Sequence, residues 1–87
     1  MKPIRVILTE KEKNLILENT FAPDYLVFRL KEAEVKGKYF KVDYSYDELD
    51  ELAGFIAAEF NHTIDEKIRR DLDKLSDKIN LIIEDEY

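Results

Sequence analysis

Three short motifs, each a hydroxyl residue followed three places later by glutamate, divide the chain. They begin at Thr9, Ser45 and Thr63. This is the spacing of the helix capping box, in which the hydroxyl accepts a hydrogen bond from a free N–H of the first turn. The glutamate accepts one from the N–H of the capping residue itself. The motifs therefore predict three helix starts and carry no information about chemistry.

The chain of 87 residues has the length of one small domain, so we expect a single domain over residues 1–87 with a thin core. It contains no cysteine and no apolar run near the ~20 residues of a membrane-spanning helix. These features predict a cytoplasmic protein. Glutamine is also absent and charged residues make up 39% of the chain, which is typical of thermophilic proteins.

The N-terminal third carries one strand pattern and one helix pattern. Residues 4–8 are rich in β-branched side chains and nearly alternate, with Ile4, Val6 and Leu8 on one side, which predicts a short strand. The helix that Thr9 caps should cover residues 10–19. Residues 20–24 are typical of a loop, and residues 23–30 fit either a short helix or the start of a long strand. Pro23 favours the helix, because its missing N–H is harmless at the first helical position.

Residues 31–44 are expected to form a β-hairpin, with strands over 31–36 and 38–44. Gly37 lies between the strands and supplies the positive φ that a tight turn requires. The two strands should turn their apolar residues toward one side. The side chains expected to face the core are Ala33, Val35, Phe40, Val42 and Tyr44.

Two amphipathic helices are predicted over residues 46–61 and 64–84, and the short turn between them should make them antiparallel. The second has apolar residues at alternating spacings of four and three, a heptad seam that Ile64 extends at the front. This seam is either core or the contact of a homodimer, and both interpretations stay open. The predicted contact residues are Leu72, Leu75, Ile79, Leu81, Ile82 and Ile83.

Together these elements predict an α+β fold. The hairpin 31–44 forms a small antiparallel sheet, which the strand 4–8 can join as a third strand. The sheet packs against the C-terminal helix pair and the short N-terminal helix. No motif in the sequence is specific enough to indicate a known family.

The net charge of −6 is unevenly distributed. Residues 29–41 carry five basic and two acidic side chains, whereas residues 42–66 carry eight acidic side chains and no lysine or arginine. The two segments either face each other or are solvated, or they form a bipolar surface that binds a charged partner or a second copy head to tail. The acidic segment is the candidate contact for a basic protein partner. A calcium loop is disfavoured, because such loops need irregular backbone with glycine at the bend. The acidic residues concerned are Asp43, Asp47, Asp50 and Glu51.

Groups suited to catalysis or cofactor binding are few. Glu59 and His62 match the Glu-x-x-His spacing of di-iron helix bundles, but those sites need two such motifs and the chain has one. The pair is therefore a weak metal candidate. The chain has one histidine and no phosphate-binding or dinucleotide-binding glycine motif. We expect no enzyme activity and no cofactor.

The sequence thus predicts a non-catalytic protein–protein interaction module that self-associates through its C-terminal helix. The alternative is a nucleic-acid accessory protein, because the hairpin interleaves basic and aromatic residues that stack on bases and contact phosphates. The negative net charge argues against that alternative. Its candidate contacts are Lys36, Lys38, Tyr39 and Lys41.

Overall fold

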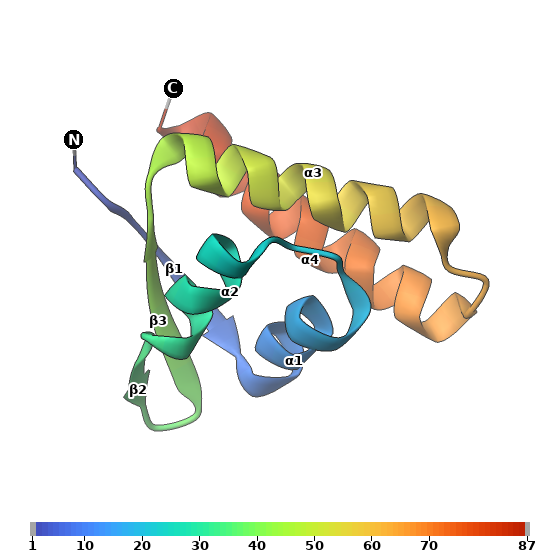
Figure 1. Ribbon diagram of the computed structural model, residues 1–87, viewed down its shortest axis with the longest axis horizontal. Coiled ribbons are helices and arrows are strands. Elements are labelled where there is room, and N and C mark those ends of the chain that lie inside the picture. The colour runs from blue at the N-terminus through green and yellow to red at the C-terminus, as the bar shows by residue number, and fades with distance from the viewer. Residues whose placement is uncertain (1, 87) are drawn as a thin grey trace.

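A computed structural model describes residues 2–86 and shows an α+β fold, with a three-stranded antiparallel sheet and the helices on one side of it (Figure 1). The two longest helices form a C-terminal antiparallel pair. The elements are β1 (Ile4–Thr9), α1 (Glu10–Asn19), α2 (Asp24–Lys31), β2 (Glu34–Lys36), β3 (Tyr39–Tyr44), α3 (Tyr46–His62) and α4 (Glu66–Asp85).

The N-terminal strand joins the hairpin, which gives the strand order β1-β3-β2. β1 lies antiparallel to the central strand β3, with Ile4 opposite Tyr44 and Leu8 opposite Phe40. The alternation predicted for β1 is confirmed, since Ile4, Val6 and Leu8 are buried beneath the helices and the residues between them are exposed. The other face of the sheet has no covering layer among the described residues (Figure 1).

The first strand of the hairpin is shorter than predicted. Residues 24–31 form α2, whose Leu26 and Leu30 are buried, so only Glu34–Lys36 remain for β2. Ala33 precedes the strand and is half-buried. Val35, which was expected to face the core, is exposed because β2 is a short edge strand that extends beyond the packed interior. The turn at Gly37 has the predicted positive φ, of 61°.

The helix predicted over residues 23–30 is confirmed as α2. Its first residue is Asp24, so Pro23 occupies the capping position rather than the first helical position. The Pro23 carbonyl accepts hydrogen bonds from the N–H groups of Leu26 and Val27, at 3.0 and 3.1 Å. These bonds start the helix without a side-chain cap.

Two of the three capping boxes are present. In α1 the Thr9 hydroxyl accepts from the Glu12 N–H at 3.1 Å, and the Glu12 carboxylate accepts from the Thr9 N–H at 2.9 Å. In α3 Ser45 and Glu48 make the same two bonds, at 3.1 and 2.8 Å. These helices begin at the predicted residues because their capping partners are close in sequence.

The third predicted box is wrong. α3 continues to His62, and the Thr63 N–H still donates to the Glu59 carbonyl at 2.9 Å, so Thr63 ends α3. Asp65 caps α4 instead, since its carboxylate accepts from the first-turn N–H groups of Lys67 and Ile68. α4 therefore begins at residue 66 rather than 64. Ile64 is 99% exposed in the connection and does not extend the seam.

The heptad seam of α4 faces the interior of the same chain. Leu72, Leu75 and Ile79 are buried, and they share the core with Leu52 and Ile56 of α3. This is the core interpretation that the spacing left open. In this fold these three side chains are not accessible at the surface.

Both capping glutamates also bind a cation. Burial raises the pKa of Glu12, but hydrogen bonds from Lys78, at 2.8 Å, and from the Thr9 N–H outweigh burial and lower it overall. The pKa of Glu48 is lowered chiefly by the Ser45 N–H, against burial, and further by Arg29 at 3.3 Å. Each carboxylate thus joins a helix start to another element.

Acid is expected to destabilise the protein through Glu12 and Glu48. Their native pKa values lie below the ordinary value of 4.5, so their stabilisation is present above that value and is lost as the pH falls through the native pKa. In urea unfolding between about pH 7 and pH 3, the double variant Glu12→Gln, Glu48→Gln should lose less stability than the native chain. Glu66→Gln is the matched control, because Glu66 belongs to no capping box. An equal loss in the native chain and the double variant would contradict this account.

Candidate functional site

The predicted nucleic-acid contacts lie on the hairpin, but acidic groups accompany them. On β3, Tyr39 and Lys41 point away from the helices, and Lys41 lies opposite Glu34 of β2. Asp43 shares this face and pairs with Arg5 of β1 at 3.1 Å. Lys36 lies opposite Tyr39, and Lys38 is exposed in the turn. The face is therefore mixed in charge rather than basic.

The four acids predicted to attract a basic partner do not form one cluster. Asp43 lies on the sheet, where it forms an ion pair with Arg5. Asp47, Asp50 and Glu51 are exposed on α3, where Glu51 accepts a hydrogen bond from the Tyr25 hydroxyl of α2. The acidic surface therefore belongs to α3 alone.

Glu59 and His62 lie one turn apart on α3, and His62 is the last residue of that helix. Among residues 2–86 no three or more histidine, cysteine, aspartate or glutamate side chains gather where they would hold a metal ion. The pair thus has no third ligand within the described chain. Its two side chains instead line an apolar groove.

That groove runs along the outer face of α3, and we call it the α3 groove. It consists of two adjoining hollows of about 500 and 380 Å³, which share Phe55 and Ala58. The larger hollow reaches the connection between α1 and α2, and the smaller one lies toward the start of α3. The residues that line the groove are Phe21, Glu51, Gly54, Phe55, Ala58, Glu59 and His62.

Phe21 forms one wall of the groove and is 88% exposed. Burying a phenylalanine side chain is worth roughly 1.5–3 kcal/mol, so one left in water beside a groove forgoes most of that stabilisation. Tyr25 and Phe28 of α2, which follow it in the chain, are also about half exposed. Three aromatic side chains therefore lie outside the core on one short segment.

Gly54 lies in the middle of α3 and lines the groove. Glycine in a helix interior destabilises the helix by roughly 1 kcal/mol relative to alanine. A Cβ atom added at Gly54 would meet no atom within 4 Å among the described residues. Packing within the chain therefore does not require glycine here, and the position is open to a molecule from outside.

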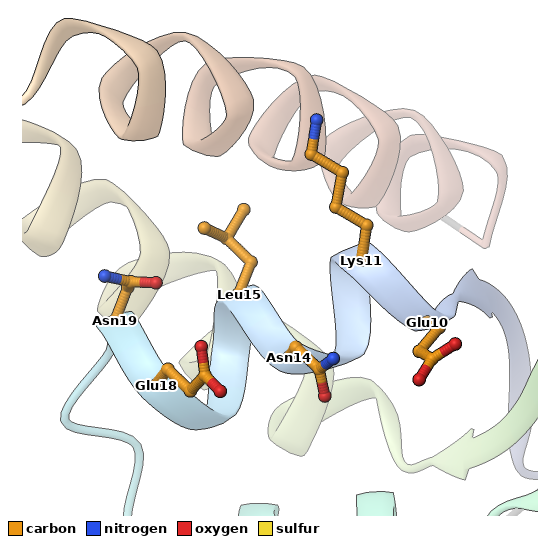
Figure 2. Close-up of a pocket in the computed structure, with 6 residues that line it drawn as sticks. All are labelled: Glu10, Lys11, Asn14, Leu15, Glu18 and Asn19. Carbon is orange, nitrogen blue, oxygen red and sulfur yellow. The ribbon is translucent and has the colours of Figure 1, made fainter.

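Another hollow lies along α1 and is lined mostly by polar side chains (Figure 2). Lys11 and Leu15 point toward α4, whereas Glu10 points away from it. Lys11 pairs with Asp71 of α4 at 3.3 Å, next to the bond between Glu12 and Lys78. The side chains here brace α1 against α4, and their polar groups do not converge on one point.

Comparisons of the chain with protein-family models, with curated proteins and with solved structures returned no match. Within residues 2–86 no helix combines the length and the apolar character needed to cross a bilayer. Only the surfaces of the chain itself therefore indicate its function.

The sequence contains one signal for the groove, in the central residues of α3. Residues 52–58 carry no charge, and Ala57 is exposed. A helix segment that is apolar all round is normally buried. In α3 one apolar face packs on α4 while Gly54, Phe55 and Ala58 form another on the outside.

Proposed function

We propose that this chain is a non-catalytic, cytoplasmic protein–protein interaction module, and that the α3 groove binds a helical segment of a partner protein. One observation carries the proposal: the uncharged residues Gly54, Phe55 and Ala58 of α3 line an open groove beside Phe21, which is almost fully exposed. Exposed apolar patches with a polar rim mark interaction sites on soluble proteins.

A helix is the occupant that the shape of the groove favours. The lining residues of α3 extend from Glu51 to His62, a length of roughly 17 Å at 1.5 Å per residue. A partner helix of about three turns spans that length and places apolar anchors at i, i+3, i+4 and i+7. Phe21 would contact the side of such a helix, and Gly54 would let its backbone approach.

Self-association through α4 stays a prediction with a smaller surface than the sequence suggested. Of the six predicted contact residues, Leu81 is 62% exposed, and Ile82 and Ile83 are half-buried against the core. A single exposed leucine at a helix end provides little area for a stable dimer. The hairpin alternative also stays a prediction, and the acidic groups among its lysines do not favour it.

Replacing Ala58 by glutamine should block the groove. Helical peptides selected from a displayed library on the native protein are expected to lose at least about tenfold in affinity for Ala58→Gln, because the longer polar side chain fills the floor of the groove. Ala57→Gln is the matched control, since Ala57 is exposed on the same helix outside the groove. Fluorescence anisotropy with each selected peptide measures the effect.

Both variants should keep the native circular dichroism spectrum and unfold within about 0.5 kcal/mol of the native chain, because both positions are exposed. Selected peptides that bind Ala58→Gln as tightly as Ala57→Gln would show that the groove is not the binding surface. The proposal would then be wrong.

A further inference from the structure

We infer that the helix bound by the α3 groove is a basic amphipathic segment of a different protein, with lysine or arginine flanking its apolar face. The inference rests on the proposed function and adds the chemical class of the partner. It follows from the charges around the groove, from how they are compensated, and from what a second copy of the chain would bring to the same surface.

The apolar floor of the groove has acidic groups at both ends. Asp47, Glu51, Gly54 and Ala58 follow one another at spacings of four, three and four, which places them on one face of α3. Glu59 lies toward the other end, beside Phe21 and His62. No lysine or arginine side chain lines the groove within the described chain. A helix lying in it therefore meets negative charge near both of its ends.

Four acids of the chain have an ion-pair partner within residues 2–86, and the acids at the groove are not among them. Glu12, Asp43, Glu48 and Asp71 each pair with a cation of the same chain. Among residues 2–86, no lysine or arginine comes within ion-pair distance of the acids at the groove, Asp47, Glu51 and Glu59. Within the described residues no ion pair offsets their charge, although Glu51 accepts a hydrogen bond from the Tyr25 hydroxyl, so these carboxylates are accessible to a cation of a bound molecule.

A second copy of this chain is a poor occupant of the groove. Its own α3 would set the same acids against the acids of the first copy, and like charges across an interface oppose association. The whole chain has a net charge of −6, so the repulsion extends beyond the contact. A basic amphipathic segment of another protein can pack its apolar face on the floor of the groove and pair its cations with Asp47, Glu51 and Glu59.

Three synthetic helical peptides test the inference. They share one leucine face at i, i+3, i+4 and i+7, and their flanking positions are all lysine, all glutamine or all glutamate. We expect the lysine peptide to bind the native protein at least about tenfold more tightly than the glutamate peptide, with the difference shrinking at high salt. Fluorescence anisotropy gives the three affinities, and the loss of binding in Ala58→Gln shows that each peptide occupies the groove.

Charge variants distinguish the effect of the acids at the groove from the effect of the net charge of the chain. Asp47→Asn with Glu59→Gln should weaken the lysine peptide about fivefold, since two exposed charge pairs are removed. The control, Asp73→Asn with Asp77→Asn, changes the net charge equally on exposed positions of α4 and should stay within about twofold. Equal weakening by both pairs would overturn the inference, because attraction would then follow net charge alone.

The failures of the two proposals look different. If the three peptides bind equally and all lose binding in Ala58→Gln, the groove is a binding surface but the inference of a basic partner is wrong. Peptides whose binding ignores Ala58→Gln, or no peptide binding at all, would overturn the proposed function as well. Selective binding of the lysine peptide that depends on the acids at the groove supports both.

Discussion

Leu75→Glu is expected to unfold the protein. Leu75 is 1% exposed on α4, within the core that α4 shares with α3. A carboxylate at this position has no buried cation to pair with and would leave water for an apolar interior, which costs several kcal/mol. That loss is comparable to the whole stability of a small domain, roughly 5 kcal/mol. Far-UV circular dichroism and urea unfolding at neutral pH measure it.

Leu81→Glu is the matched control, with the same substitution six residues later on the same helix. Leu81 is 62% exposed, so the variant should stay folded and within about 0.5 kcal/mol of the native chain. Light scattering on both variants gives their mass in solution. If the Leu75→Glu variant stays folded and its solution mass is half that of the native protein, the apolar seam of α4 is an interface between copies.

The elements that the sequence predicted best are those fixed by neighbours along the chain. A capping box needs only residues i and i+3, and the boxes at Thr9 and Ser45 are therefore readable before any fold is known. The third motif failed because Asp65, two residues after Thr63, is a competing cap. Which of them starts α4 depends on where α3 ends, and α3 ends one residue later than predicted.

The α4 seam shows a different limit. Apolar residues at spacings of four and three suit a helix that packs in its own domain as well as one that packs on a second copy. The distinction depends on where α3 and the sheet lie, and the spacing contains no information about that. In this fold Leu72, Leu75 and Ile79 are buried within the chain, and the solution mass tests whether α4 also takes part in self-association.

The α3 groove was beyond prediction for a related reason. It joins Phe21 to α3 residues more than thirty positions away, and no local pattern brings them together. The exposure of Phe21 is a tertiary property, since the same side chain in another packing would belong to the core. The sequence does contain the uncharged segment 52–58. This segment is apolar on more than one face, and α4 packs against only one of them.

Tyr44 presents a buried polar group without compensation. It is the last residue of β3, opposite Ile4. Tyr44 and Leu49 are both buried and occupy the two positions of a hydrophobic staple around the Ser45 cap of α3. Its hydroxyl oxygen has no hydrogen-bond partner among residues 2–86. Burial, assisted by the nearby charge of Glu48 and opposed by Arg29, raises the pKa of this hydroxyl. The group therefore remains neutral and buried.

Tyr44→Phe should consequently stabilise the protein. The ring and its packing are kept, while a hydroxyl that lost its water on folding is removed, so the free energy of unfolding is expected to rise by about 1 kcal/mol. Urea unfolding measures the change, with an unaltered slope as the sign that the native fold is intact. Tyr39→Phe is the control: its half-exposed hydroxyl keeps its water, so its stability should change by less than about 0.5 kcal/mol. A loss of stability in Tyr44→Phe would instead mean that the Tyr44 hydroxyl makes a hydrogen bond in the folded protein. The start of α3 would then be held by a polar contact as well as by packing.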